Sequence, residues 1–405
     1  MNVNRANTTK LLAAYFLYEC GRAMYFVLIT WFLFKWTQDA IYTGLFVSFG
    51  FIPGLLSNLV FGVLVDRYNR KRLANLAGAI SFVVLLLLMA TAITGYISPW
   101  TIIAAHMMMQ TAGSLYRPSL QALTAEVFDK ETLPRIFSLS SSATISGGLA
   151  GAAIGGILSG MVPISGSLGV VLSLYGAAWT AVWRLHYERN SQLSPSKSLN
   201  IIGELKDGFN YLSLHPMLYG LFAMMMLGQL TFHTTIGFLS VYTSEYLHQN
   251  SVTYGLLDAC FSAGGILAGI LGTWWWYKCK NRLAVWSLTA MAAGLFLLGC
   301  TQHLLFVFIG VLGVGLGTSW IRALLQSIQQ MSTDKEYHGR MSSFRMLSNQ
   351  ASVVISGPIF GVIAASRGAN EVFLFLLVPV ALGIIWAVFQ SNDPAFVKIT
   401  NNKTA

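Results

Sequence analysis

Apolar residues come in long runs along this chain, and polar residues collect in the short stretches between the runs. Each run holds about 20 residues, the length that an α-helix needs to cross the hydrocarbon core of a bilayer. The runs occupy residues 11–34, 41–65, 73–95, 99–122, 136–160, 164–186, 217–243, 252–276, 283–301, 303–328, 341–366 and 370–390. The pattern therefore predicts an all-α membrane protein with twelve transmembrane helices.

The connections between several neighbouring runs are very short, as in the stretch from Gly95 to Pro99. Short connections favour antiparallel helix hairpins, because backbone polar groups in lipid need partners within the protein. The longest connection, residues 187–217, contains an amphipathic stretch at 201–209. We therefore expect a six-helix bundle in residues 1–187, a cytoplasmic linker with a short surface helix in 188–216, and a second six-helix bundle in 217–405.

The composition of the chain argues against a soluble protein. Of its 405 residues, 55% are hydrophobic and only 10% are charged, whereas soluble domains have about 25% charged residues. We find no ATP motif, phosphate-binding loop or metal-ligand cluster in the sequence, and so expect no cofactor and no enzymatic activity. The four cysteines follow no metal spacing and are expected to be reduced thiols. The first apolar run is too long for a cleavable signal peptide.

The positive charges are distributed unevenly between the two sides of the predicted bundle. With both termini on one side, 20 of the 25 Lys and Arg residues fall on that side, and only Lys35 and Arg367 on the other. The remaining three, Arg22, Arg117 and Arg322, lie inside the runs. This bias predicts that both termini face the cytoplasm, and we expect the membrane to be a bacterial cytoplasmic membrane. The net charge of +10 also indicates attraction to anionic membrane lipid rather than to nucleic acid.

The two halves of the chain repeat each other at a fixed offset. Seven residues of the first half recur 205 positions later with the same identity: Arg117, Gln121, Asp129, Lys130, Glu131, Arg135 and Ser138 correspond to Arg322, Gln326, Asp334, Lys335, Glu336, Arg340 and Ser343. Parallel repeats of this kind are typical of transporters that bind a small molecule between their halves. A structural scaffold with the same symmetry is the alternative.

The loop after the second run carries a family resemblance. Residues 62–72 read GVLVDRYNRKR, and this stretch resembles the signature loop of the major facilitator superfamily at the place where that family has it. The resemblance implies that Gly62, Asp66, Arg67, Arg70 and Lys71 form a cytoplasmic latch that holds the two halves together in the outward-facing state. We expect a carboxylate to complete the latch, and Glu126 is the candidate; simple topogenic charge is the alternative reading.

The fifth run resembles the antiporter motif of the same family. The motif's small residues are Gly147, Gly151, Gly155 and Gly156, and small residues of this spacing let two helices pack closely. Ala152 stands where the motif has proline, which weakens the export signature. The second copy of the signature loop also departs from the pattern, since Trp276 stands where the aspartate would be.

Ionisable residues inside the runs are candidates for coupling transport to protons, since a charge inside the bilayer is costly. Glu19 and Arg22 share one helix face, and they form either a static ion pair or a proton or substrate site. His106 and Arg117 belong to a polar stripe with Gln110 and Gly113, which we expect to face the cavity. Arg322 repeats this stripe in the second half with Gln326 and Gln329; the alternative for Arg117 and Arg322 is a place in the cytoplasmic charge network.

Two further residues complete the set of coupling candidates. Asp258 is either a proton carrier or a residue at the mouth of the cavity, and His233 is either a coupling residue or a hydrogen-bonded core histidine. A proton exporter needs an acid whose proton affinity changes with its surroundings. We therefore rank Glu19 and Asp258 first as proton carriers.

The resemblance covers the whole chain, and finer features are similar to its macrolide-efflux and enterobactin-exporter branch. These features are Pro53-Gly54, the stretch 117–123 (RPSLQAL), Asp207-Gly208-Phe209 and His215-Pro216. The resemblance implies a monomeric, proton-driven antiporter that exports an amphipathic small molecule, such as a siderophore, an antibiotic or a related metabolite, with possible drug resistance. An importer or lipid flippase of the same fold and a transporter-like sensor are the alternatives.

Overall fold

A computed structural model describes residues 2–129, 131–187, 207, 209–334 and 337–401 of the chain. Every regular element in these residues is a helix, and twelve of the helices have 18 residues or more, as the apolar runs predict. In the described part, ten continuous helical stretches are long and apolar enough to cross a membrane. The stretch Ser251–Cys300 contains two of the twelve helices, and Pro99–Val127 is not among the ten. The chain is a multi-pass membrane protein.

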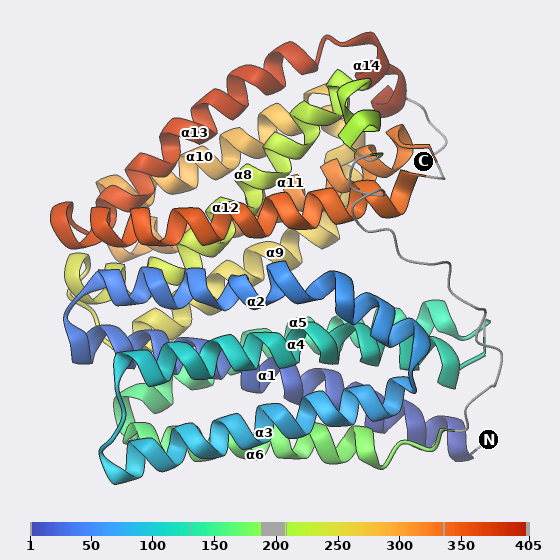
Figure 1. Ribbon diagram of the computed structural model, residues 1–405. Coiled ribbons are helices and arrows are strands. Elements are labelled where there is room, and N and C mark those ends of the chain that lie inside the picture. The colour runs from blue at the N-terminus through green and yellow to red at the C-terminus, as the bar shows by residue number, and fades with distance from the viewer. Residues whose placement is uncertain (1, 130, 188–206, 208, 335–336, 402–405) are drawn as a thin grey trace. The chain divides into compact units, whose positions relative to one another are not determined.

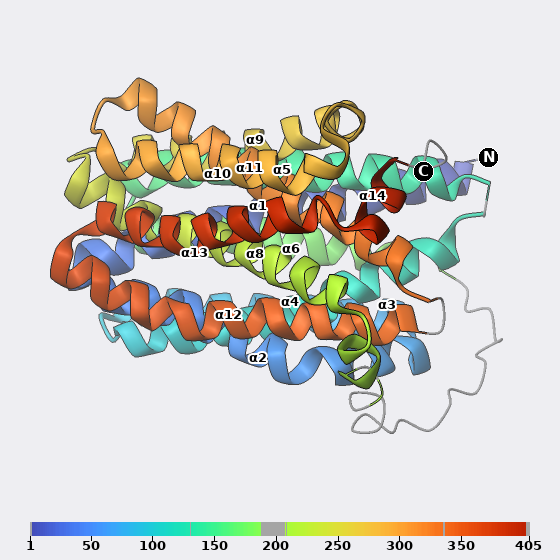
Figure 2. The ribbon, with the colours of Figure 1, turned by 90° about the horizontal axis from the view of Figure 1, so that it is seen from above.

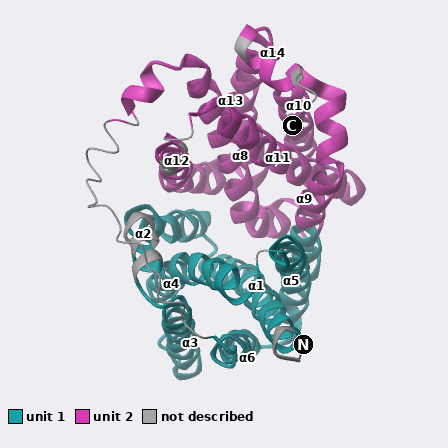
Figure 3. Cartoon of the chain, turned by 90° about the vertical axis from the view of Figure 1, so that its right-hand side faces the viewer, with its two compact units in different colours: residues 1–197, 249–259 teal, residues 198–248, 260–405 magenta. Residues whose placement is uncertain are grey.

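The helices form two compact units, which are described separately (Figure 3). Unit 1 consists of residues 1–197 and 249–259, and unit 2 of residues 198–248 and 260–405. Residues 188–206 and 208 lie outside the described residues, and with them lies most of the expected linker and its surface helix. The proposed domain boundaries at 187 and 217 therefore stay a prediction.

Unit 1 contains the first six helices, which run side by side in Figure 1. They are α1 (Asn2–Thr37), α2 (Ala40–Arg67), α3 (Arg70–Thr94), α4 (Pro99–Val127), α5 (Leu133–Met161) and α6 (Ile164–Trp183). α1 packs mainly against α5 and α6, and α4 packs against α2 and α3. α1 thus lies inside the unit, which brings its ionisable residues into contact with other helices rather than with lipid.

Unit 2 contains most of the remaining elements (Figure 2). They are α8 (Pro216–Val241), the π-helical turn η1 (Tyr242–Tyr246), α9 (Ser251–Cys279), the 3₁₀ turn η2 (Lys280–Arg282), α10 (Leu283–Cys300), α11 (Leu304–Ser332), α12 (His338–Arg367), α13 (Ala369–Gln390) and the short α14 (Pro394–Asn401). The first turns of α9 belong to unit 1. α8 packs against α11, α12 and α13, much as α1 packs inside unit 1.

Local sequence explains where the helices of unit 1 begin and end. α3 begins after Asn69, whose side chain accepts a hydrogen bond from the Arg72 N–H, and it ends at Gly95 with a φ of 78°. α4 begins with a capping box between Ser98 and Thr101, followed by a proline at its first position. These caps satisfy backbone groups that a helix end leaves unpaired, and the Asn69 cap fixes the start of α3, which carries polar side chains described below.

The 205-residue repeat is visible in the backbone. The Thr132 N–H donates to the Asp129 carbonyl over 2.9 Å, and the Tyr337 N–H donates to the Asp334 carbonyl over the same 2.9 Å. These two pairs are 205 positions apart. The turn that joins α4 to α5 is therefore built like the turn that joins α11 to α12, although Lys130, Lys335 and Glu336 lie outside the described residues.

Candidate functional site

One carboxylate and two guanidinium groups meet between α1 and α4. Glu19 Oε2 accepts a hydrogen bond from Arg22 Nε at 2.6 Å, and Glu19 Oε1 lies 2.8 Å from Arg117 Nη2. The Glu19–Arg22 pair follows from their spacing on one helix face. The sequence did not indicate that Arg117 joins them. We call these three residues the Glu19 triad.

The Glu19 triad carries an excess of positive charge, and its cations are its accessible part. The side chain of Glu19 is 8% exposed, whereas those of Arg22 and Arg117 are 40% and 49% exposed. Charged groups at membrane depth turn toward water or partners rather than toward lipid. The two guanidinium groups can therefore meet a solute, while the carboxylate holds them in place.

Aromatic rings pack beside the Glu19 triad. The Arg117 guanidinium carbon lies 5.9 Å from the centre of the Tyr18 ring. Tyr18 stacks on Tyr116 of α4 at 4.2 Å and meets the edge of Tyr175 of α6 at 5.3 Å. Cation–π contact and ring stacking restrict the side chains that they involve. The triad is thus held by three helices, α1, α4 and α6.

His106 lies deeper in unit 1 and is only 4% exposed. Its ring stacks on Phe46 of α2 with the ring centres 3.8 Å apart, and Tyr25 lies on a parallel plane at 5.9 Å. Gly50 leaves room for the ring, because a side chain at that position would collide with His106 Nε2. The polar stripe of α4 therefore divides: Arg117 is accessible, and His106 is packed between α1 and α2 instead of facing a cavity.

Asp258 lies two turns into α9, in the part of that helix that belongs to unit 1. It is 6% exposed, and within the described part of the chain its carboxylate makes no hydrogen bond or ion pair. One turn earlier, the Tyr254 hydroxyl is 2.7 Å from Thr30 Oγ1 of α1, and the Tyr254 ring stacks on Trp31. This contact ties the start of α9 to α1 and keeps Asp258 on the inner side of the unit.

Unit 2 has a counterpart of the Glu19 triad that lacks the carboxylate. The Arg322 guanidinium carbon lies 4.5 Å from the centre of the Phe232 ring, as Arg117 lies over Tyr18. The residue after Tyr18 is Glu19, whereas the residue after Phe232 is His233. His233 Nε2 lies 2.7 Å from Gln229 Nε2. Arg322 makes no ion pair with a carboxylate among the described residues, so this second site also has an excess of positive charge.

The remaining residues of the α11 stripe are divided in the same way as those of α4. Gln329 is 2% exposed and bonds to Thr333 within its own helix. Gln326 is half-buried one turn beyond Arg322. Arg322 is half-buried like Gln326, and it is the charged member of this stripe.

Charged residues also connect the helix ends at one end of unit 1. Arg70 of α3 forms an ion pair with Glu126 of α4, and the Tyr187 hydroxyl donates to Glu126 over 2.5 Å. Lys71 donates to the Leu185 carbonyl and Lys10 to the Arg184 carbonyl, both over 2.8 Å. We call this group of contacts the basic end of unit 1. Gly62, Asp66 and Arg67 of the expected latch lie outside the described side chains.

The basic end differs from the sequence-based interpretation in two respects, the partner of Lys71 and the contact of Tyr187. Glu126 was the expected partner of Arg70, and the two do pair; Lys71 instead bonds a backbone carbonyl after α6. The part played by Tyr187 was not anticipated, because its position follows from the chain's return after α6. In unit 2, the hydroxyl of Tyr211 bonds to Asp334, and burial raises the pKa of Tyr211 above its ordinary value.

The glycines of α5 lie against the backbone of α1. A side chain at Gly147 would collide with the Phe16 carbonyl, and one at Gly151 would collide with the Cys20 carbonyl. Gly155 faces Met24 farther along the same contact. Small residues at this four-residue spacing let α1 and α5 approach to backbone contact. That approach places Glu19, next to Cys20, where α1 is in backbone contact with α5.

Gly156 makes a second close contact within unit 1. A side chain there would lie 2.6 Å from the Cα atom of Gly255 in α9, and a side chain at Gly255 would meet Gly156 in the same way. Three residues beyond Gly255 stands Asp258. The glycine motif of α5 therefore positions both acids that the sequence ranks first.

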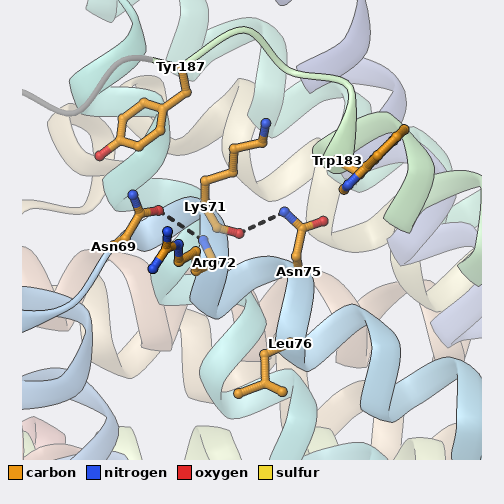
Figure 4. A pocket seen from close by; sticks show the side chains of 7 residues that line it. All are labelled: Asn69, Lys71, Arg72, Asn75, Leu76, Trp183 and Tyr187. Atoms are coloured by element: carbon orange, nitrogen blue, oxygen red, sulfur yellow. Dashed lines mark hydrogen bonds between the residues drawn. The ribbon is translucent and has the colours of Figure 1, made fainter.

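A pocket of about 550 Å³ opens at the basic end of unit 1, between the start of α3 and the end of α6 (Figure 4). It is lined by Asn69, Lys71, Arg72, Asn75, Leu76, Trp183 and Tyr187. In Figure 4, Lys71 extends between Tyr187 and Trp183, with Asn69 and Arg72 on one side and Asn75 on the other. None of the described residues that line it is acidic. In the described residues, no three His, Cys, Asp or Glu side chains come together as metal ligands.

Comparison with known families gives one match that spans nearly the whole chain. The family model described as "Major Facilitator Superfamily" matches residues 11–237 and 221–404. Among solved structures, the nucleoside transporter NupG superposes with a TM-score of 0.76 over 98% of this chain and 100% of its own, at 13% identity. At that identity the likeness concerns the fold alone.

The proteins that are similar to this chain in sequence include three transporters. The uncharacterized MFS-type transporter YvqJ of Bacillus subtilis is 22% identical, with 85% of this chain and 82% of its own covered. Macrolide efflux protein A of Streptococcus pyogenes is 23% identical, with 85% of this chain and 86% of its own covered. The staphyloferrin A transporter of Staphylococcus aureus is 21% identical, with 79% of this chain and 80% of its own covered.

Proposed function

Because the chain belongs to the major facilitator superfamily, and is thus a membrane transporter rather than an enzyme, we propose that it exports an amphipathic small molecule in exchange for protons. One relative supports export, since it is named for macrolide efflux, and another is named for transport of staphyloferrin A. The energy source is the proton gradient, so no cofactor is needed. The protein works as a monomer in the bacterial cytoplasmic membrane, with both termini in the cytoplasm.

The Glu19 triad is the observation that carries this proposal. Within unit 1, it joins two accessible guanidinium groups to one carboxylate. Guanidinium groups bind carboxylates and phosphates through charge-assisted hydrogen bonds. Tyr18 supplies an apolar face beside Arg117. This combination favours an amphipathic substrate with an acidic group, such as a carboxylate siderophore, over a cationic antibiotic.

Asp258 is the better of the two candidate proton carriers. A carboxylate that lies between two guanidinium groups, as Glu19 does, takes up a proton poorly. Asp258 is buried and makes no ion pair with the described residues, so a change in its surroundings can change its protonation. We assign Glu19 to holding the substrate-binding arginines and Asp258 to carrying the proton; His106 and His233 are the remaining candidates.

The basic end of unit 1 supports alternating access. Arg70 and Glu126 form the part of the latch whose side chains are described, and Asp66, Arg67 and Lys71 complete it in the proposal. The glycines of α5 support export through the motif that they resemble, although Ala152 replaces its proline. An importer or flippase of the same fold, or a transporter-like sensor, would keep the latch but would not exchange substrate for protons in the outward direction.

Everted membrane vesicles test the proposal. Vesicles from cells that express the protein are acidified inside, and the pH gradient is followed with an acridine dye while candidate compounds are added. We expect staphyloferrin A or a comparable carboxylate siderophore to dissipate the gradient, and a cationic macrolide to do so at least about tenfold less well, a difference of roughly 1.4 kcal/mol. Uptake of a compound that persists without a gradient would contradict proton-driven export.

A further inference from the structure

The pocket at the basic end of unit 1 concentrates positive charge. Lys71 and Arg72 line it, and they lie in the first turn of α3, which contains no acidic residue. The N-terminus of a helix carries a partial positive charge of its own. Lys71 uses one of its three N–H groups to bond the Leu185 carbonyl, and Arg72 makes no ion pair with a described residue. Two cationic groups therefore have hydrogen-bond donors to offer an anion.

The pocket also offers an acceptor that has no partner among the described residues. Asn75 Nδ2 donates to the Lys71 carbonyl over 2.8 Å (Figure 4), while Asn75 Oδ1 is buried and makes no hydrogen bond to any described residue. A buried polar atom without a partner costs free energy until a donor reaches it. An occupant that satisfies the whole pocket therefore combines an anionic group for Lys71 and Arg72 with a hydroxyl or amine donor for Asn75.

An apolar strip begins at this pocket and continues along α3. Leu76 lines the pocket and is 53% exposed; Ile80, Val83 and Leu87 follow it at helical spacing, all exposed. Trp183, 64% exposed, flanks the strip at the end of α6. Exposed tryptophan is typical of the interface between lipid headgroups and acyl chains. A charged pocket thus adjoins a surface suited to hydrocarbon.

We propose that this pocket binds the headgroup of an anionic phospholipid, with one acyl chain along Leu76, Ile80, Val83 and Leu87. Its phosphate contacts Lys71 and Arg72, and a headgroup hydroxyl, as in phosphatidylglycerol, donates to Asn75 Oδ1. The bound lipid links α3 to α6 beside the Arg70–Glu126 pair, because Lys71 follows Arg70 and the Tyr187 that lines the pocket also bonds Glu126. Lipid binding at this pocket requires that the protein is inserted in a membrane, and it does not depend on which substrate is transported.

Native mass spectrometry of the purified protein tests the proposal, with dioleoyl phosphatidylglycerol and dioleoyl phosphatidylcholine as probes. We expect the intact protein to retain phosphatidylglycerol at least about fivefold better than phosphatidylcholine. The double variant Lys71→Gln/Arg72→Gln removes this preference. Lys278→Gln/Lys280→Gln removes two exposed basic residues of unit 2 and serves as the matched control, which keeps the preference.

Two further variants keep the test decisive if the double variant folds poorly. Arg72→Gln leaves the Lys71–Leu185 bond intact and should lower the preference at least about twofold. Asn75→Leu removes the free acceptor and should lower retention of phosphatidylglycerol more than that of dioleoyl phosphatidic acid, which has no headgroup hydroxyl beyond the phosphate. A melting curve of each variant in detergent checks that the fold is unchanged.

Soluble competitors distinguish a lipid from a free anion. Inorganic phosphate and glycerol 1-phosphate, each at about 10 mM, should not displace phosphatidylglycerol, because they lack the acyl chain that follows α3. Displacement by either would overturn the lipid assignment in favour of a phosphate site. Equal loss of lipid from the Lys71/Arg72 and Lys278/Lys280 variants would also overturn it, since the attraction would then be a general effect of charge.

Discussion

Arg117 of α4 lies 2.8 Å from the Glu19 carboxylate of α1, and Arg22 reaches the other oxygen of the same carboxylate at 2.6 Å. Each arginine is accessible, and the acid between them is not. The acid therefore serves to hold two cations at fixed positions, and the cations remain available for binding. Four substitutions at contacts of the described residues test these roles, and each has its own control.

Replacing Glu19 with glutamine should reduce transport of an acidic substrate at least about tenfold and destabilise the protein. The change leaves two guanidinium groups without the buried counter-charge that they share, and removing one partner of a charge pair is destabilising. The measurements are transport in everted vesicles and thermal unfolding in detergent. Lys35→Gln, at the exposed end of the same helix, should change neither, and unchanged transport by Glu19→Gln would remove Glu19 from the site.

Replacing Asp258 with asparagine should uncouple transport from the proton gradient while leaving substrate exchange intact. The amide keeps the size of the side chain but cannot carry a proton. Vesicles preloaded with substrate should still exchange it at close to the normal rate, and addition of substrate should no longer dissipate the pH gradient. Tyr254→Phe is the control, because it removes the bond to Thr30 and leaves the carboxylate. Normal coupling in Asp258→Asn would shift the proton to Glu19 or a histidine.

Replacing Glu126 with glutamine should weaken the basic end of unit 1 by about 1–3 kcal/mol, because Arg70 loses its ion pair and Tyr187 its charged acceptor. We expect a lower melting temperature and slower transport. Tyr187→Phe removes one hydrogen bond only and should have a smaller effect. The exchange Arg70→Glu/Glu126→Arg should recover part of the loss; no recovery would indicate that other contacts of Arg70 matter more.

Replacing Gly151 with alanine should lower the yield of folded protein severely, because the methyl group collides with the Cys20 carbonyl of α1. Gly148 is the matched control, since it lies on the same helix and a side chain there meets nothing within 4 Å. Size-exclusion chromatography of fluorescent fusions gives the comparison. Equal yields of Gly151→Ala and Gly148→Ala would mean that α1 and α5 can separate without cost.

Much of the candidate site could be anticipated from short-range spacing. Glu19 and Arg22 are one turn apart in a helix, so their contact follows from sequence alone. Arg70 and Glu126 could be paired because the signature loop and the end of α4 had to lie at the same side of the membrane. Arg117 and Tyr187 could not be assigned, because their partners come from helices whose rotation the hydrophobic pattern leaves open. For the same reason, the sequence could not show that His106 of the α4 stripe is buried while Arg117 of the same stripe is accessible.

The sequence by itself determined the membrane class, the twelve helices, the repeat and the family, because these follow from the length of apolar runs, the identity of a loop and a constant offset. Only the tertiary structure decided that Arg117 shares the carboxylate of Glu19, that His106 is buried against Phe46, and that Asp258 makes no ion pair within the described chain. Those outcomes depend on how far each helix is rotated and how closely α1 approaches α5. Both are set by side-chain packing between segments that are distant in the sequence.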